Sequence, residues 1–271
     1  MFYADVMARK GFKPWQELSL GIATVAVIGY AVLSLAPMLI APLVPQRVWN
    51  TLGAVALEGL TGGAGPCSAG GGPAALSALV ARLGEGGNEI PAVTVSAYPI
   101  SVLNAWAVPG GTIVLTSELI AEADTAEEVA GVLAHEIGHI REHHAETQVV
   151  RELGIGILAG LGSGGGMATS MAILRYSRDD EREADAIALE IVHRAAIDPA
   201  GLRSFFGKMQ LQEGGEFPGK IGNMMQTHPM TRERIDAVRP LPAGVVARAA
   251  LSAGHWAALK GICSVKQDFS D

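Results

Sequence analysis

Residues 18–46 contain no charged side chain, and this run restricts the possible folds more than any other feature of the sequence. A helix of about 20 residues is long enough to cross the ~30 Å hydrocarbon core of a bilayer. We therefore predict a transmembrane anchor over residues 18–45, with membrane lipid as its partner. A cleaved signal peptide is the alternative, but Pro37 directly follows the best small-residue site at Ala36, which disfavours cleavage.

The charged residues predict the orientation of this helix and exclude one class of partner. Arg9, Lys10 and Lys13 precede the helix, whereas only Arg47 lies close on its other side. The positive-inside rule then places residues 1–17 in the cytoplasm and the bulk of the chain across the membrane. The formal net charge is −7 and no segment is rich in lysine or arginine, so we expect no nucleic-acid partner.

The chain has two cysteines, Cys67 and Cys263, and both follow the predicted anchor. In an oxidising compartment they can form a disulfide that ties the C-terminal segment to the glycine-rich region around Cys67. The alternative is a pair of buried free thiols, because sequence spacing alone does not prove a connectivity.

Three short runs typical of β-strands follow a helical lead-in. Residues 46–90 form this lead-in, with two short helical segments on either side of a stretch rich in glycine and proline. The runs at 92–98, 101–108 and 112–116 are rich in β-branched and apolar residues, and turn residues separate them. They predict a small sheet at the start of a domain that we place at residues 91–271.

Two long helices are predicted after the strands. Thr125 and Glu128 form a capping box, which predicts a helix over about 126–153, and a second helix is expected over about 171–197. Between them, residues 154–174 are apolar but rich in glycine, so we interpret them as two half-helices rather than a second membrane span. Strands followed by helices indicate an α+β fold.

The segment HEIGH lies on the first of these helices. His135 and His139 stand four residues apart, so on a helix their rings share one face at a spacing that suits two metal ligands. Glu136 follows the first histidine, where its carboxylate can reach a water molecule at the metal without being a ligand. We expect His143 and His144 either to lie on the helix surface or to contact a metal-binding side chain without binding the metal themselves.

A catalytic zinc commonly has three protein ligands, so a third ligand must come from elsewhere in the chain. The segment SRDDEREAD offers Glu181 and Asp185, which are four residues apart and share a helix face. One of them can bind the metal while the other accepts a proton from a ligand histidine, and Glu183 is expected to point elsewhere. The alternative is an acidic, solvated helix surface.

These two motifs occur in order with NAWAVPGG before them and THPMTRERI after them. Together they resemble the membrane-associated gluzincin family of the CAAX prenyl protease, HtpX and BepA. Within the family, they resemble a bacterial subgroup that has a single membrane helix and is similar to the mitochondrial stress-activated inner-membrane protease. The resemblance implies a zincin fold, mostly helical with a small mixed sheet, and a periplasmic peptidase domain on the bacterial inner membrane.

The resemblance also assigns roles to individual residues. It implies that one Zn²⁺ per chain binds His135, His139 and Glu181, that Glu136 is general base and then general acid, and that Asp185 orients a ligand histidine. It further implies that His228 and Arg234 approach the metal and take part in gating or in steadying the oxyanion.

The function expected from these residues is hydrolysis of peptide bonds in unfolded or extended protein segments, as in envelope quality control. We expect the strand at 112–116 to be an edge strand beside the cleft, to which an extended polypeptide adds by main-chain hydrogen bonds. The residues expected to contact substrate are Asn104, Thr112, Ile113, Val114 and Leu115.

Two alternative functions fit the sequence less well. A catalytically silent, chaperone-like binding module would use zinc only for structure, but such a site would normally close its fourth position and has no need of Glu136. A processing enzyme that acts within the bilayer on lipidated substrates would need several membrane spans, and the sequence offers one secure span.

Overall fold

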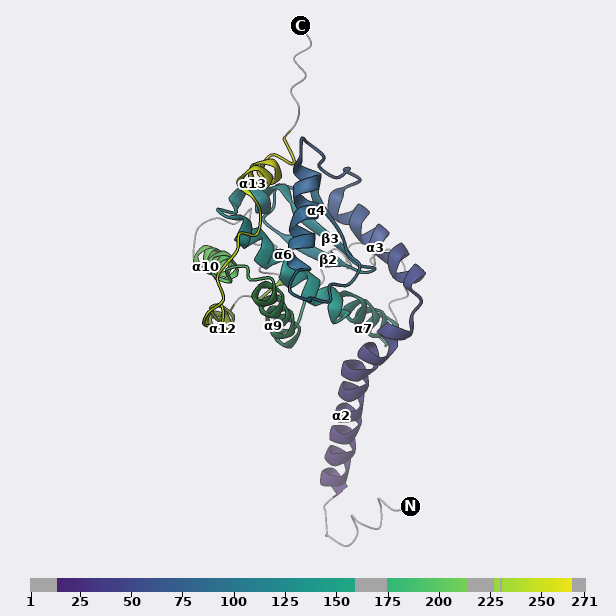
Figure 1. Cartoon of the computed structure of the whole chain (residues 1–271). Coiled ribbons are helices and arrows are strands. Elements are labelled where there is room, and N and C mark those ends of the chain that lie inside the picture. Colours follow the sequence, from purple (N-terminus) through teal and green to yellow (C-terminus); the bar gives the residue numbers. More distant parts are fainter. Residues whose placement is uncertain (1–13, 159–174, 214–226, 230, 265–271) are drawn as a thin grey trace.

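The structure is a computed structural model that describes residues 14–158, 175–213, 227–229 and 231–264 (Figure 1). The predicted half-helices over 154–174 lie mostly outside the described residues, because only positions 154–158 belong to the described part.

Helix α2 (Pro14–Ile40) projects from the rest of the molecule (Figure 1). Residues Trp15–Leu43, which include the short helix η1 (Ala41–Leu43), have a mean hydropathy of 2.1 in their most apolar window. Within the described residues this is the one helix that is long and apolar enough to cross a membrane. Helix α3 (Gln46–Thr61) then turns back along the body, and the indole nitrogen of Trp49 donates to the carbonyl oxygen of Ala41 at 3.3 Å.

The sheet has three strands, β1 (Thr94–Tyr98), β2 (Ala105–Val108) and β3 (Thr112–Thr116), in the spatial order β1-β3-β2. Strand β1 pairs with β3 in parallel, and β2 pairs with β3 antiparallel. The prediction that residues 112–116 form an edge strand is therefore wrong, because β3 is the central strand.

The local geometry explains this order. Gly110 and Gly111, with φ of 87° and 90°, form the tight turn that folds β2 against one side of β3. The other side of β3 is then free to pair with β1. The outer edge of β1 is occupied in turn, since the Cys67 amide donates to the Ala97 carbonyl oxygen at 2.8 Å. The other edge strand of the sheet is β2.

Helix α6 (Ala126–Arg141) lies at the centre of the domain, and nearly every residue from 126 to 140 is buried. Thr125 caps it, as predicted, by accepting a hydrogen bond from the Glu128 amide at 3.3 Å. Around α6 pack the sheet and four further helices. These helices are α4 (Gly72–Leu83), α7 (His144–Leu158), α9 (Arg178–Arg194) and α10 (Ala200–Glu213). Three of these helices, α4, α9 and α10, contribute with the sheet to the main apolar core, whereas α7 contributes Ala145 and Val149 to a second apolar cluster.

Two predicted helix boundaries are wrong. The helix expected over 126–153 is interrupted, because His143 has a φ of 55° and separates α6 from α7. The helix expected from about residue 171 begins only at Arg178, since Ser177 and Asp180 form a reciprocal capping box there. Of the expected first turns, residues 171–174 lie outside the described part, and 175–177 are not helical.

The C-terminal part crosses back over the molecule. Helix α12 (Arg232–Ala237) and an extended segment lead to α13 (Ala253–Lys260), which packs against α4. Just beyond α13, Cys263 forms a disulfide with Cys67, with a sulfur–sulfur distance of 2.05 Å. The Ala69 amide also donates to the Ile262 carbonyl oxygen at 2.9 Å, so this segment is held by covalent and hydrogen bonds together.

Candidate metal centre

The close packing of α6 against its neighbours positions the metal centre. Gly131 and Gly138 lie seven residues apart on α6, and a Cβ atom at either would come within 2.8 Å of a neighbouring helix. The neighbour is Leu202 of α10 in the first case and Ala184 of α9 in the second. Because Gly138 has no side chain, α9 approaches α6 closely enough to bring its acidic residues to the histidines.

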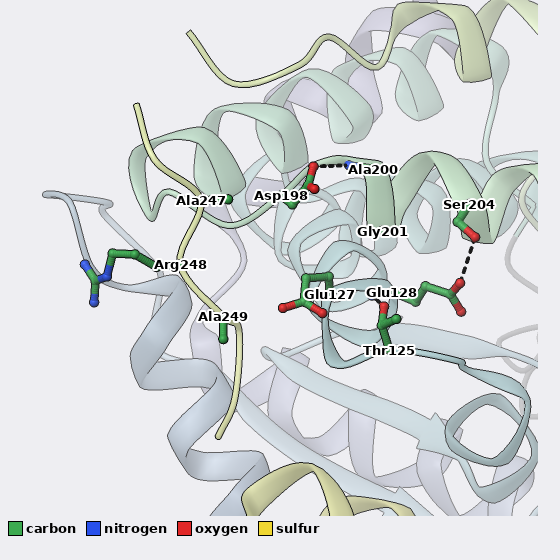
Figure 2. A pocket seen from close by; sticks show the side chains of 10 residues that line it. All are labelled: Thr125, Glu127, Glu128, Asp198, Ala200, Gly201, Ser204, Ala247, Arg248 and Ala249. Carbon is green, nitrogen blue, oxygen red and sulfur yellow. Dashed lines mark hydrogen bonds between the residues drawn. The ribbon is translucent and has the colours of Figure 1, made fainter. Parts of the chain in front are cut away.

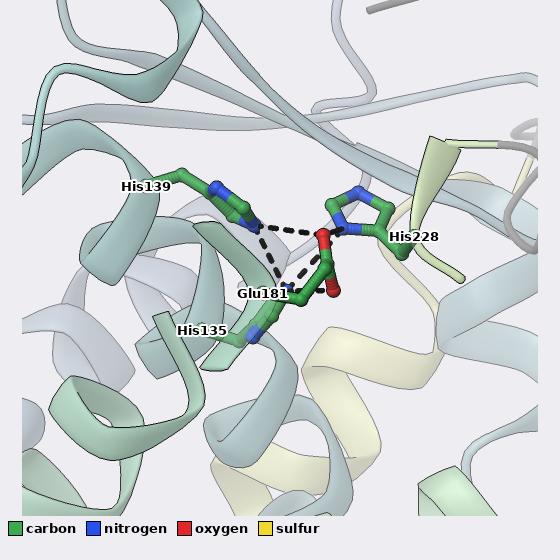
Figure 3. A group of neighbouring side chains, drawn as sticks. All are labelled: His135, His139, Glu181 and His228. Carbon is green, nitrogen blue, oxygen red and sulfur yellow. Dashed lines mark hydrogen bonds and ion pairs between the residues drawn. The ribbon is translucent and has the colours of Figure 1, made fainter. Parts of the chain in front are cut away.

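The two histidines of HEIGH face one point in the interior. His135 and His139 are at most 3% exposed, and their Nε2 atoms lie 3.0 Å apart. Glu181 of α9 is fully buried, with Oε2 3.5 Å from His135 Nε2 and Oε1 3.5 Å from His139 Nε2. The three side chains named as ligands from the sequence thus come together in the structure (Figure 3).

A fourth side chain, His228, joins this cluster. Its Nδ1 lies 3.0 Å from Glu181 Oε1 and 3.3 Å from His135 Nε2, and the residue is 1% exposed. One potential ligand atom from each of the four residues lies within 4.8 Å of the others (Figure 3). The resemblance had implied only that His228 approaches the metal, whereas the structure puts it within the cluster that can hold the ion.

Glu136 lies beside the cluster with an unusual environment. It is fully buried, and neither carboxylate oxygen has a hydrogen-bond partner among the described residues. His228 Nε2 lies 3.7 Å from its Oε1. A buried carboxylate without partners is costly, so this arrangement fits a site that also holds a metal ion and water.

Asp185 and Arg234 contact residues of the cluster without belonging to it. Asp185 Oδ1 lies 2.9 Å from His135 Nδ1, the ring nitrogen that faces away from the other ligands. Arg234 donates to both oxygens of Asp185, at 2.6 and 2.8 Å, and its Nη1 lies 2.5 Å from Glu181 Oε2. Arg234 also donates to the Pro229 carbonyl oxygen at 3.0 Å, so it ties the segment that carries His228 to α9.

Burial and the neighbouring charges shift the pKa values of these groups. Burial holds the pKa of His139 well below its usual value, which keeps the ring neutral and able to bind a metal. Burial alone would raise the pKa of Glu181, but His228, His139 and Arg234 outweigh it and lower that pKa strongly. For His228, Glu181 and Glu136 outweigh the effect of burial and raise the pKa.

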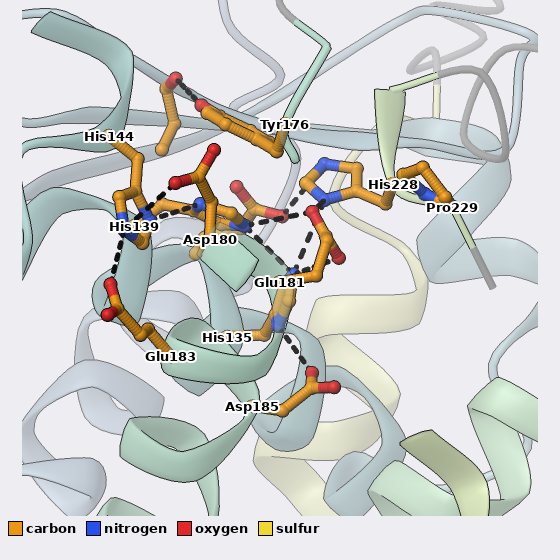
Figure 4. Close-up of polar contacts among 12 residues, drawn as sticks. His135, His139, His144, Tyr176, Asp180, Glu181, Glu183, Asp185, His228 and Pro229 are labelled. Atoms are coloured by element: carbon orange, nitrogen blue, oxygen red, sulfur yellow. Dashed lines mark hydrogen bonds and ion pairs between the residues drawn. The ribbon is translucent and has the colours of Figure 1, made fainter. Parts of the chain in front are cut away.

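Sequence analysis did not identify Tyr176, which contacts the cluster directly. Its ring stacks on His139 with centroids 3.8 Å apart, and its hydroxyl donates to the Ala107 carbonyl oxygen on β2 at 3.3 Å (Figure 4). Burial, followed by the negative charge of Glu136, raises the pKa of Tyr176 well above its usual value, so the hydroxyl stays protonated. The only sequence signal for Tyr176 was its position, two residues before α9 begins at Arg178.

His144 was predicted either to lie on the helix surface or to contact a metal ligand without binding the metal. In the structure it contacts the candidate ligand His139. It is 6% exposed, and its Nδ1 lies 2.9 Å from His139 Nδ1 (Figure 4). Glu183, expected to point elsewhere, lies 3.2 Å from His144 Nε2. The neighbouring His143 has an exposed side chain.

Most of the residues predicted to bind substrate are buried or already paired within the sheet. Ile113, Val114 and Leu115 are fully buried in the central strand, and Thr112 is paired there with partners on both sides. Main-chain pairing of a substrate with residues 112–115 is therefore excluded, because β1 and β2 already use those backbone groups. Asn104 is buried before β2, where its Oδ1 accepts from the Ala105 amide at 2.8 Å and its Nδ2 has no partner among the described residues.

A separate pocket of about 440 Å³ lies where the start of α6 meets the start of α10 (Figure 2). Its acidic groups are already engaged, since Glu127 accepts from the Ala250 amide and Glu128 binds Ser204 and Lys208. None of the four cluster residues lines it. The chemistry of this chain therefore belongs to the cluster around His135.

Comparisons with known proteins agree with this site. The chain is 28% identical over 156 residues to the beta-barrel assembly-enhancing protease of Yersinia pestis, a match that covers 51% of this chain but 32% of that relative. It is 28% identical over 177 residues to metalloprotease YcaL of Escherichia coli, covering 60% of this chain and 67% of YcaL.

A similar match, 29% identity over 174 residues, is found with the mitochondrial metalloendopeptidase OMA1 of Schizosaccharomyces pombe, covering 60% of this chain and 51% of that protein. The sequence pattern of peptidase family M48 matches residues 76–241, a span that includes every residue of the cluster together with Glu136, Asp185 and Arg234. This span is more than half of the chain, and the chain therefore belongs to the metallopeptidases of family M48.

Proposed function

We propose that this protein is a membrane-anchored, zinc-dependent endopeptidase that cleaves unfolded or extended protein segments. One observation carries the proposal: the buried cluster of His135, His139 and Glu181 stands beside Glu136, whose two oxygens have no hydrogen-bond partner among the described residues. A purely structural metal site has no use for such a carboxylate.

The donor set supports zinc as the metal. Two imidazole nitrogens and one carboxylate are a common ligand set of catalytic zinc, which keeps a further position for water or substrate. His135, His139 and Glu181 would hold the ion, and Asp185 would accept the proton of His135 Nδ1 at 2.9 Å. When bound, the zinc would polarise the scissile carbonyl group and lower the pKa of a water molecule toward ~7.

Glu136 would carry the protons in this reaction. As general base it takes a proton from the attacking water, and as general acid it passes that proton to the nitrogen of the leaving amine. The peptide bond breaks, the water oxygen remains on the new carboxyl group, and Glu136 ends as it began. Because no donor in the described part of the chain competes for them, both oxygens are available for these transfers.

The free edge of β2 is the place that supports binding of an extended substrate. Thr116 donates to the Asn104 carbonyl at 3.2 Å, so by the alternation of an antiparallel pair the backbone groups of Ala105 and Ala107 face away from β3. A polypeptide can add there through main-chain hydrogen bonds, with little demand on its sequence. It must displace the Tyr176 hydroxyl from the Ala107 carbonyl oxygen and the Asn104 side-chain oxygen from the Ala105 amide.

His228 supports a latent state of the enzyme. Its Nδ1 belongs to the set of atoms that lie within 4.8 Å of one another, so it can occupy the fourth metal position itself. A histidine at that position would displace the reacting water. We therefore propose that the segment carrying His228 moves away before catalysis.

The location is proposed from three observations. Helix α2 supports a single membrane anchor, and the basic residues before it favour a cytoplasmic N-terminus. The disulfide between Cys67 and Cys263 suits an oxidising compartment such as the periplasm. Relatives named beta-barrel assembly-enhancing protease support a proteolytic role in protein quality control, which we propose for the bacterial inner membrane.

The test uses the full chain in detergent with an unfolded model protein as substrate. We expect cleavage that a chelator abolishes and added zinc restores. Glu136→Gln should keep zinc and fold but lose cleavage by several orders of magnitude, because a neutral amide cannot take the proton. Glu142→Gln is the matched control, since Glu142 directly follows α6 and is exposed.

A chaperone-like protein with structural zinc would behave differently. It would bind the unfolded substrate without cleaving it, and Glu136→Gln would then be indistinguishable from the unchanged protein. Zinc-independent cleavage, or near-normal turnover of Glu136→Gln, would contradict the proposed mechanism.

A further inference from the structure

We propose that His144, with Glu183 behind it, is a positioning residue that fixes the tautomer and the ring orientation of His139. The proposal rests on the proposed zinc site and deepens it. It starts from one contact, the 2.9 Å distance between His139 Nδ1 and His144 Nδ1, which links a candidate ligand to a residue that the family comparison leaves without a role (Figure 4).

A break in the helix makes this contact possible. In an unbroken α-helix five residues turn by ~500°, so His144 would stand ~140° around the helix from His139 and could not face it. The structure ends α6 at Arg141, gives His143 a φ of 55°, and begins α7 at His144. The left-handed residue turns the chain so that the His144 ring returns to the outer side of His139.

The proton positions then follow from the geometry. His139 Nε2 faces His135 and Glu181, so a metal ion at the cluster takes the lone pair of that atom. The His139 proton must therefore sit on Nδ1 and be donated to His144 Nδ1. His144 accepts there only if its own proton sits on Nε2, and that atom lies 3.2 Å from Glu183 Oε2 and 3.9 Å from Asp180 Oδ1.

Each of the two histidines of HEIGH thus has its own partner, Asp185 on α9 for His135 and His144 on α7 for His139. Asp185, which Arg234 fixes with two hydrogen bonds, lies 2.9 Å from His135 Nδ1. His139 Nδ1 lies 2.9 Å from the imidazole of His144, whose own partner, Glu183, has a 60% exposed side chain. Because the order His139, His144, Glu183 runs from the buried cluster to the surface, it can be tested at its exposed end without disturbing the core.

The experiment measures zinc affinity, by competition with a chromophoric chelator, for the full chain in detergent. His144→Phe keeps a buried ring but removes the acceptor, and we expect its zinc affinity to fall by about 10- to 100-fold. His144→Asn places an amide oxygen near the position of Nδ1 and should restore most of the affinity. Glu183→Ala should lower the affinity by a smaller factor, because Asp180 remains near His144.

One further measurement and one control variant test whether the effect is specific to His144 and Glu183. Cobalt in place of zinc gives an absorption spectrum that reports ligand geometry, and we expect it to change in His144→Phe and Glu183→Ala. The control is His143→Asn, which removes a neighbouring exposed ring and tolerates the left-handed backbone. That control should bind zinc as the unchanged protein does.

The outcomes separate this inference from the proposed function. If the unchanged chain binds no zinc, the proposed function fails. If it binds zinc but His144→Phe and Glu183→Ala match the His143→Asn control in affinity and cobalt spectrum, the role of His144 is refuted. Should His144→Phe fail to fold, the exposed Glu183→Ala variant decides alone, a changed spectrum supporting the role and an unchanged one excluding it.

Discussion

His228 has two opposite roles open to it, and the effect of removing its ring distinguishes them. Since its Nδ1 lies within the ligand cluster, we expect it to fill the fourth metal position in the latent enzyme. His228→Ala should then raise the basal rate of cleavage with zinc retained. The measurement is turnover of an unfolded model protein alongside the zinc content of the variant.

Other results would assign His228 differently. A loss of cleavage by about 10²-fold with zinc retained would make it a donor to the oxyanion of the transition state, the role that its distance of 3.7 Å from Glu136 also allows. A loss of about 1 kcal/mol of stability with unchanged turnover would leave it a structural residue only.

At the scale of elements, the break between α6 and α7 depends on the backbone of His143. A left-handed conformation costs an L-residue roughly 1–2 kcal/mol, and a β-branched side chain tolerates it least. We expect His143→Val to lower the free energy of unfolding by about 1–2 kcal/mol, whereas His143→Gly should change it little. Thermal unfolding of the two variants measures the difference. Equal melting temperatures would mean that the break is held by other contacts.

The attachment of α10 to the start of α6 depends on pH. Lys208 of α10 binds Asp124 at 2.6 Å and Glu128 at 2.7 Å. Burial lowers its pKa, but these two carboxylates outweigh it and raise the pKa above the usual 10.5. A raised lysine pKa stabilises the fold fully below the unfolded pKa, and this contribution is lost as the pH rises through the folded pKa.

We therefore expect Lys208→Met to destabilise the protein by about 1 kcal/mol at neutral pH. The difference in melting temperature from the unchanged protein should stay constant up to about pH 10 and shrink at higher pH. A difference that grows in alkaline solution would contradict this assignment.

For the whole molecule, the disulfide connects parts of the chain that are 196 residues apart. Such a link restricts the unfolded chain, so reducing it should lower the stability by about 2–5 kcal/mol. Protein trapped in the cell and labelled under denaturing, non-reducing conditions should show no reactive thiol. Two reactive thiols would argue against the bridge, and labelling of the domain only from the cytoplasmic side would overturn the proposed orientation.

The sequence alone determined the features that depend on local geometry. His135 and His139, like Glu181 and Asp185, stand four residues apart, and a helix puts such pairs on one face whatever surrounds it. The Thr125 cap and the apolar stretch of α2 are local in the same way. The family motifs added Glu181 as the third ligand candidate, which spacing had left open between Glu181 and Asp185.

The tertiary structure decided what depends on contacts between distant segments. The order of the strands depends on which segments pair with β3 after the turn at Gly110. Residues 112–116, predicted to be an edge strand, therefore form the central strand, and β2 lies at an edge. The entry of His228 into the cluster needs a contact across 93 residues of sequence. The pairing of His144 with His139 needs a left-handed residue that no helical periodicity predicts. The local spacings thus fix which side chains share a face, while nonlocal packing fixes which of those faces meet.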